Sequence, residues 1–297
     1  MRRSGSLLLL VAVTAVWGYT FVPVQKAVES FPLFTFLGFR FAVSAAVLAP
    51  FAAAPLRRLP RSGFAAGLGA GALLGLAYAL QTAGLRLTTV SSTGFITGLY
   101  VVLAPLLALV LFRTSVPGAA WAGVALSVVG LLLLNGVPGG SAAGNALVLG
   151  NALAQALQIA LMERFAPRHD VRALTFLQMA IASVGFFVIA AGRGELAWPH
   201  GGSVWYGILV TGVFAGALGY LVATWVQART TAARAALVFT LEAPFAAFFG
   251  VVLLSERLGW IGWTGCAVML AGILVAEPAA AEGLRRLAGR PIRSGAR

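Results

Sequence analysis

The chain has little charge and almost no cysteine. Only 10% of its 297 residues are charged, whereas a soluble globular domain averages about 25%. This composition excludes an ordinary soluble enzyme or binding module. The single cysteine, Cys266, excludes an internal disulfide and a metal site made of cysteines alone. The two histidines, His169 and His200, fall between the apolar runs, so we expect no metal site and no cofactor.

Hydrophobic residues make up 60% of the chain, and the mean hydropathy is +0.94. Apolar runs recur with short breaks, and a helix needs about 20 apolar residues to cross a hydrocarbon core of ~30 Å. The runs are apolar on every face, as in 126–134, which does not suit the alternation of barrel strands. We therefore predict an all-α integral membrane protein with ten transmembrane helices. The predicted spans are 7–28, 33–54, 64–85, 91–112, 118–135, 144–164, 173–191, 204–225, 233–254 and 259–276.

Basic residues number 21 and acidic residues 8, which gives a formal net charge of +13. With a cytoplasmic N-terminus and Arg40 set aside inside its span, all basic residues fall on the cytoplasmic side except Lys26, Arg86, Arg193 and Arg257. Because cytoplasmic loops carry the excess of Lys and Arg, we expect both termini in the cytoplasm and the chain in the cell (inner or plasma) membrane. This placement explains the charge without nucleic acid as a partner. The basic tail 279–297 is expected to contact anionic lipid of the bilayer.

The sequence also contains an internal repeat. At one offset of 142 residues, the first-half residues Trp121, Gly123 and Gly130 recur as Trp263, Gly265 and Gly272. The same offset lays 88–89 on 230–231, both Thr-Thr. A turn-forming linker at 135–143 separates five spans from five, so the second half enters the membrane from the opposite side. Inverted repeats of this kind form many secondary transporters. We therefore expect a first repeat at 1–135 and a second at 144–278.

Polar side chains inside hydrocarbon are costly, so their positions are informative. Those that recur at helical spacing or share a helix face are Trp17, Tyr78, Gln81, Thr97, Tyr100, Asn151, Gln155, Gln158, Tyr220 and Thr224. One interpretation is that they line a central cavity that binds a small organic molecule. The other is that threonines bond to their own helix and glutamines bridge helices, with no ligand present.

Two ionisable residues lie inside spans. Glu242 is roughly 13 Å and Arg40 roughly 10 Å from opposite membrane faces, at ~1.5 Å of rise per residue. Their depths in a ~30 Å core differ by only ~7 Å. Desolvation favours the neutral form of a buried carboxyl, so Glu242 is a candidate proton-coupling group. The alternative is a structural ion pair of Glu242 with Arg40 or another cation.

Three prolines fall inside spans. Pro23, Pro105 and Pro244 each remove a backbone donor and are predicted to bend their helices. Pro105 and Pro244 miss the 142-residue offset by three residues, about one helical turn, so they lie on similar faces. Bends near the membrane midplane suit a gate, and the alternative is a kink kept for packing.

These patterns carry a family resemblance. The segments 241–257, with Glu242, Pro244 and Gly250, and 263–272, with Trp263 and Gly272, resemble the end of an EamA-type repeat of the drug/metabolite transporter superfamily. The segments 15–21, 39–41 and 94–107 resemble the first, second and fourth helices of that repeat. The resemblance implies ten helices, alternating access and a central cavity between two four-helix clusters. It also implies export of amino acids or other small metabolites, and a homodimer formed through the fifth and tenth helices. Thr114 stands at the offset of Glu256, so an acidic role repeated in both halves does not extend to Glu256.

The leading hypothesis is a secondary active transporter, an exporter of a small organic metabolite such as an amino acid, with proton coupling through Glu242. A lipid or lipid-precursor flippase on the same fold is an alternative, and a membrane scaffold that transports nothing is another. An intramembrane enzyme is disfavoured, because the chain has no HExxH motif, no histidine inside a span and no Walker lysine motif.

Overall fold

The computed structural model describes residues 3–136, 139–255 and 257–276, and every regular element in these ranges is helical. The first half contains α1 (Arg3–Val28), α2 (Leu33–Arg57), α3 (Arg61–Leu85), α4 (Val90–Gly98), α5 (Tyr100–Phe112) and α6 (Gly118–Asn135). The second half contains α7 (Ala142–Phe165), η1 (Ala166–Arg168), α8 (Val171–Gly192), α9 (Gly202–Val210), η2 (Thr211–Gly219), α10 (Tyr220–Gln227), α11 (Ala232–Phe239), α12 (Glu242–Leu254) and α13 (Trp260–Ala276). The prediction of an all-α protein is confirmed.

Within the described residues, nine helical segments are long and apolar enough to cross a membrane, and α13 is an apolar helix of 17 residues. Each of the ten ranges predicted from the sequence falls on one of these segments. The chain is therefore a multi-pass membrane protein. Glu256 and the tail 279–297 lie outside the described residues.

Three predicted spans are not continuous α-helices. The span 91–112 is broken at Leu99, and the span 233–254 is broken at Thr240 and Leu241. At the second break, Pro244 has no N–H to donate to the carbonyl of Thr240, which instead accepts a hydrogen bond from Ala243 N at 3.2 Å. The span 204–225 contains the nine-residue π-helix η2. Hydropathy does not report which carbonyl each backbone N–H bonds, so the breaks and the π-helix could not be predicted from the sequence.

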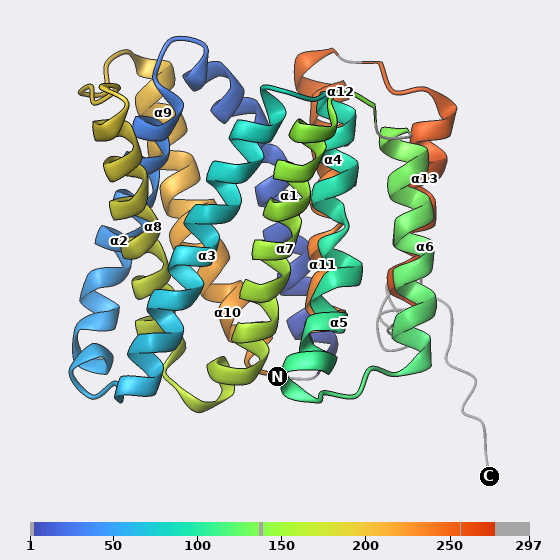
Figure 1. Ribbon diagram of the computed structural model, residues 1–297, viewed down its shortest axis with the longest axis horizontal. Coiled ribbons are helices and arrows are strands. Elements are labelled where there is room, and N and C mark those ends of the chain that lie inside the picture. Colours follow the sequence, from blue (N-terminus) through green and yellow to red (C-terminus); the bar gives the residue numbers. More distant parts are fainter. Residues whose placement is uncertain (1–2, 137–138, 256, 277–297) are drawn as a thin grey trace.

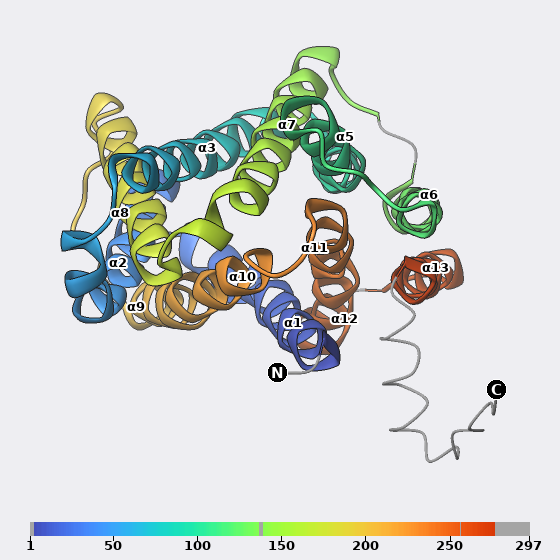
Figure 2. The same ribbon diagram turned by 90° about the horizontal axis from the view of Figure 1, so that it is seen from below.

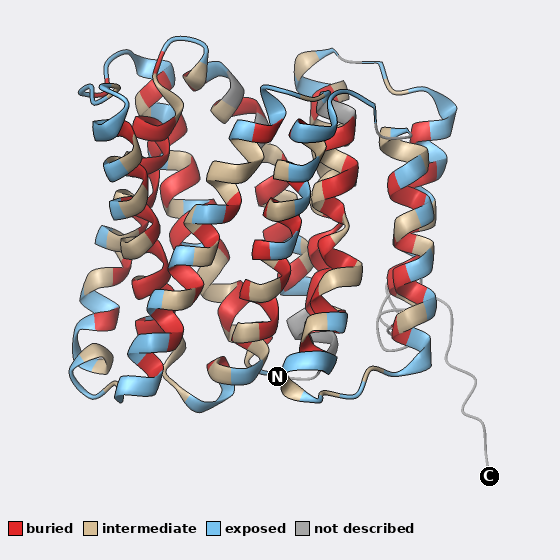
Figure 3. Ribbon diagram, in the orientation of Figure 1, coloured by how far each residue is buried: buried red, intermediate tan, exposed pale blue. Residues whose placement is uncertain are grey.

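The outer surface of the bundle is apolar. Figure 3 shows buried residues gathered toward the inside of the bundle and exposed ones around its outside. Large apolar side chains are among the most exposed, such as Val110 at 73%, Val188 at 65% and Val184 at 59%. A soluble protein rarely exposes large apolar patches of this kind, and hydrocarbon is a suitable solvent for them. The burial pattern therefore agrees with a chain surrounded by lipid.

The helices form two groups of unequal size. Figure 1 shows them running roughly parallel, and Figure 2, seen from below, shows α6 and α13 together at one edge of the bundle. These two helices pack extensively against each other. A Cβ added to Gly130 would lie 2.7 Å from the carbonyl oxygen of Gly265, and the reverse distance is also 2.7 Å. Glycines let helix backbones approach closely in lipid, so the repeated glycines of the sequence form this seam.

Candidate functional site

The polar row of α7 faces the protein interior. Asn151 is fully buried, and Gln158 is 7% exposed. Asn151 Nδ2 donates to Thr97 Oγ1 of α4 at 2.8 Å, and Gln155 Nε2 donates to Asn151 Oδ1 at 2.9 Å. Gln158 Nε2 donates to Gln178 Oε1 of α8 at 2.7 Å. Gln158 therefore bridges helices, which is the ligand-free interpretation.

A group of four polar residues joins α3, α4 and α7. We call Gln81, Thr97, Asn151 and Gln155 the amide cluster. Gln81 Nε2 donates to Thr97 Oγ1 at 3.2 Å, so that this one hydroxyl accepts hydrogen bonds from two amides. Gln81, Thr97 and Gln155 remain partly exposed. The cluster therefore combines a fixed network with polar groups that a molecule could still reach.

Arg40 lies buried in α2 among aromatic rings. Its side chain is 5% exposed, and its Cζ is 5.5 Å from the ring centre of Phe41 and 6.0 Å from that of Tyr78. A guanidinium over an aromatic face is stabilised by the ring quadrupole. Tyr220 of α10 interacts electrostatically with both Arg40 and Tyr78. Arg40 is therefore a buried cation that interacts with a tyrosine of α3 and a tyrosine of α10.

Trp17 lies in a second group of interior side chains, and this group is aromatic. Its ring centre lies 5.2 Å from that of Tyr220 and 5.3 Å from that of Phe239. Its Nε1 donates to the carbonyl oxygen of Ala215 in η2 at 3.0 Å. We call Trp17, Tyr220 and Phe239 the aromatic cluster. Sequence reasoning missed Phe239, because it is one apolar residue among many in its span.

Glu242 and Tyr100 occupy the same place in their helices. Each is the first residue of the helix that follows a break, α12 and α5 respectively. They interact electrostatically with each other, and Glu242 also interacts with Arg40. Among the described residues, no ion pair joins Glu242 to Arg40, since the ion pairs there are Asp170–Arg172 and Arg193–Glu195. Glu242 and Arg40 therefore interact electrostatically without a direct ion pair.

The remaining predicted residues are placed as follows. Thr224 of α10 is 1% exposed, and its Oγ1 has no hydrogen-bond partner among the described residues. Pro244 lies in the first turn of α12, directly after a break. Pro23 and Pro105 lie inside continuous helices, α1 and α5. Only the position of Pro244 thus coincides with an interruption of the helix.

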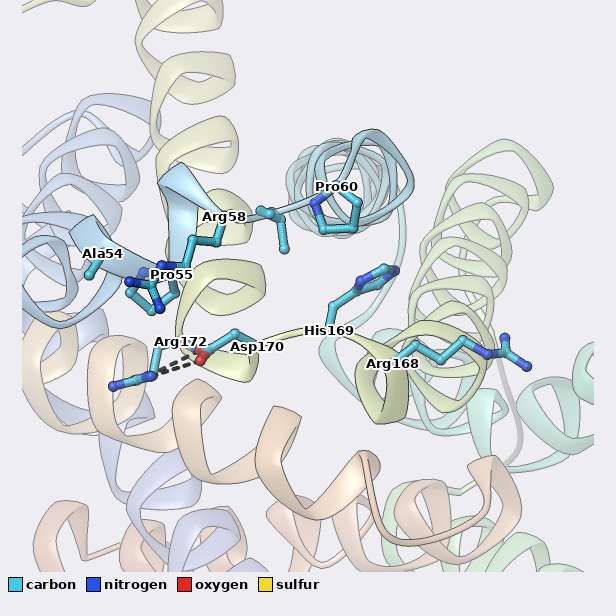
Figure 4. Close-up of a pocket in the computed structure, with 9 residues that line it drawn as sticks. Ala54, Pro55, Arg58, Pro60, Arg168, His169, Asp170 and Arg172 are labelled. Atoms are coloured by element: carbon cyan, nitrogen blue, oxygen red, sulfur yellow. Dashed lines mark hydrogen bonds and ion pairs between the residues drawn. The ribbon is translucent and has the colours of Figure 1, made fainter.

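A pocket of about 320 Å³ lies at one end of the bundle, where the α2–α3 connection approaches η1 and the start of α8 (Figure 4). It is lined by Ala54, Pro55, Arg58, Leu59, Pro60, Arg168, His169, Asp170 and Arg172. Arg172 binds Asp170 at 2.7 Å, and this hydrogen bond lowers the pKa of Asp170, against the opposing effect of partial burial. Figure 4 shows the Arg168 side chain directed away from the pocket. None of the residues predicted for substrate binding lines it.

Apolar helices here enclose polar, aromatic and ionisable side chains, which in a membrane protein mark a functional interior. Residues 4–136 and 142–276 match the EamA-like transporter family, and the chain belongs to that family. This confirms the resemblance read from the sequence. An uncharacterized transporter from Archaeoglobus fulgidus is 30% identical over 278 residues, which cover 93% of this chain and 86% of the relative. A crystal structure shares the fold at a TM-score of 0.79 and 20% identity, covering 96% of this chain and 99% of that one.

Proposed function

We propose that this protein is a secondary active transporter that exports a small organic metabolite, such as an amino acid, by alternating access. It is a carrier and not an enzyme, and it works without a cofactor. The observation that carries the proposal is the electrostatic interaction between Tyr100 and Glu242. They stand at the 142-residue offset, each begins a helix after a break, and they interact with each other. Matched positions of two repeats that converge inside the bundle are expected where a carrier binds its substrate.

Further local features that recur at the same offset support two inverted repeats of five spans. Thr89 accepts a hydrogen bond from Ser92 N as the N-cap of α4, and Thr231 accepts one from Arg234 N as the N-cap of α11. The residues after α5 and α12, Arg113 and Ser255, both adopt the left-handed conformation, with φ of 56° and 57°. They are the two non-glycine residues with positive φ in the described part of the chain.

Helix packing supports the same plan. With ten spans, α2 and α8 are counterparts in the two repeats, as are α6 and α13, and each pair packs together. The third span of the first repeat, α3, packs against α7, which is the first span of the second repeat. The third span of the second repeat, formed by α9, η2 and α10, packs against α1, which is the first span of the first repeat. We propose repeats at 1–135 and 144–278, both termini in the cytoplasm, and the cell membrane as location. The α6–α13 pair at the edge is the surface through which a homodimer would form.

The two clusters suit a substrate with unlike ends. The amide cluster offers amide donors and acceptors, and the aromatic cluster offers ring faces. Arg40 of α2 adds a basic group, and Glu242 of α12 adds an acidic group. A zwitterion with an apolar side chain, such as a neutral amino acid, matches this set of groups.

Binding and flux test the proposal directly. We expect neutral amino acids, screened beside nucleosides and sugars, to raise the melting temperature of the protein in detergent, since a ligand at 100 times its Kd adds ~2.7 kcal/mol to stability. The same amino acids, radiolabelled, should exchange across proteoliposomes and not across protein-free vesicles. The absence of both a stabilising compound and an exchange flux would refute the transporter.

Thr97→Val tests whether the amide cluster binds the substrate. Valine cannot accept hydrogen bonds from Gln81 and Asn151, so both amides lose their fixed position. We expect about a tenfold rise in the Kd of the stabilising amino acid, equivalent to ~1.4 kcal/mol, measured by thermal shift at several concentrations. Thr82→Val is the matched control, because the Thr82 hydroxyl donates to the carbonyl of Tyr78 in its own helix. An equal Kd for both variants would assign the amide cluster to helix packing.

A further inference from the structure

Five buried side-chain polar atoms among the described residues have no hydrogen-bond partner: Arg40 Nε, Ser127 Oγ, Glu163 Oε2, Thr224 Oγ1 and Gln227 Nε2. Buried polar atoms in proteins are nearly always paired, with protein or with ordered water. Ser127 lies apart from the others, in α6. Two of the other four, Thr224 and Gln227, lie on α10, and Arg40 and Glu163 can be linked to the same helix, so the four call for a common explanation.

Thr224 and Gln227 lie on α10, and Arg40 and Glu163 interact with residues near the start and beyond the end of that helix. Arg40 interacts with Tyr220, the first residue of α10, and Thr224 and Gln227 follow Tyr220 at i+4 and i+7 on one face of that helix. At ~1.5 Å per residue, the face from Tyr220 to Gln227 is roughly 10 Å long. Thr224 is 1% exposed and Gln227 is 3% exposed, so neither reaches bulk solvent or lipid.

Glu163, the fourth of these residues, lies on α7. Its carboxylate interacts with the backbone N–H of Ala232, the first residue of α11, and four residues connect Ala232 to Gln227. Both α10 and α11 pack against α7, and α10 also packs against η1. Figure 1 shows the ends of α7 and α10 in the lower part of the bundle, where α1 begins. By the proposed orientation this end faces the cytoplasm.

The chemistry of the unpaired atoms indicates what pairs with them. Gln227 Nε2 and Arg40 Nε are donors, Glu163 Oε2 is an acceptor, and the Thr224 hydroxyl is both. A bare cation would leave the two donors unpaired, and an apolar molecule would leave all four. Water satisfies donors and acceptors alike, and a single molecule needs only about 10–15 Å³ of space.

We propose that bound water molecules occupy a path between α7 and α10, and that this path connects the cytoplasmic face at Glu163 with Arg40 and Glu242 inside the bundle. The path itself does not depend on the proposed function. Its use does rest on that function, because a proton-coupled carrier needs a hydrated route by which protons reach Glu242. The charged groups nearest to Glu163 along the chain and on α10, α11 and η1 include Arg164 of α7, Arg168 of η1, Arg229 after α10 and Arg234 of α11.

Cysteine labelling on α10 tests the path. The native cysteine is first removed by Cys266→Ala, and single cysteines are placed at Thr224 and Gln227 on the path and at Val226 as the control. Val226 is equally buried, at 1%, but lies on another face of α10. A thiol reacts through its thiolate, which forms in water and not in apolar surroundings. The probe is a charged, membrane-impermeant methanethiosulfonate, added to inside-out vesicles.

We expect Thr224→Cys and Gln227→Cys to react about tenfold faster than Val226→Cys, and only from the cytoplasmic side. Equal protection at all three positions would refute the path. Equal reaction at all three would also refute it, because it would indicate general opening of α10. No substrate enters this assay, so its result is independent of transport. If the labelling differs as expected but the protein transports no amino acid, the water path stands and the proposed function is refuted.

A second measurement uses the unmodified chain, in case a cysteine variant fails to fold. Hydroxyl radicals generated by X-rays from bound water oxidise the side chains beside that water. We expect oxidation at Tyr220, on the path, to exceed oxidation at Met179 and Met269, which are fully buried in apolar clusters. Methionine is among the side chains that hydroxyl radicals oxidise most readily, so both methionines would also be oxidised if radicals reached the whole interior. Oxidation confined to exposed residues would refute the bound water.

Discussion

Glu242→Gln is expected to yield a folded protein whose transport rate no longer changes with pH. Glutamine has nearly the shape of glutamic acid but cannot bind or release a proton in this range. The proposed coupling would therefore be lost while packing is kept. Folding should persist, because no ion pair involving Glu242 is present among the described residues. Breaking a buried ion pair, by contrast, costs about 3–5 kcal/mol.

The measurement is exchange of a radiolabelled neutral amino acid in proteoliposomes over a series of pH values, together with thermal unfolding of the same preparation. Glu195→Gln is the control. Glu195 lies outside the membrane-spanning helices and pairs with Arg193 at 2.6 Å, so its variant should keep the parent pH profile. A Glu242→Gln protein with the parent profile would exclude Glu242 as the coupling group. A protein that no longer folds would instead support the structural ion pair.

The spans could be predicted from the sequence, and their interruptions could not. Hydrocarbon thickness sets the length of an apolar helix, and this was sufficient to place segments such as α6 at its exact bounds, 118–135. At the breaks, backbone N–H groups bond the carbonyl three residues back instead of four, as Leu99 N does with Ile96 and Leu241 N does with Val238. The π-helix η2 likewise differs from an α-helix only in which carbonyl each N–H meets. The residue types of an apolar segment constrain its backbone hydrogen bonds only weakly, so the same segment is compatible with α, 3-10 or π hydrogen bonding.

For the site, helical spacing predicted which faces turn inward but not which partners they meet. Asn151 and Gln158 both face the interior as expected. Asn151 meets Thr97 and joins the amide cluster, whereas Gln158 meets Gln178 and holds α7 to α8. Their separation follows from how α4 and α8 pack around α7, which is a property of the whole bundle. The same limit applies to Phe239, whose contact with Trp17 requires α1 and α11 to be placed first.

Gly18→Ala should abolish transport, because Gly18 is where α1 and α12 touch. A Cβ at this position would lie 2.5 Å from Phe245 Cβ, 2.7 Å from Ala246 N and 2.8 Å from the carbonyl carbon of Phe245. Two of these atoms belong to the backbone, so a side-chain rotation cannot make room. The helices must separate, at a cost of about 1–3 kcal/mol for overpacking. Separation also displaces Trp17, which precedes Gly18.

Gly185→Ala is the matched control for this substitution. Gly185 is also helical, in α8, and no atom lies within 4 Å of its added Cβ. Alanine favours a helix by up to ~1 kcal/mol over glycine, so this variant should melt at or slightly above the temperature of the parent and exchange amino acid at the parent rate. Gly18→Ala should melt lower and exchange none. If the two variants behaved alike, α1 and α12 would not be in backbone contact. The aromatic cluster would then owe its position to Trp17 Nε1 and the carbonyl of Ala215 in η2 rather than to the approach of these two helices.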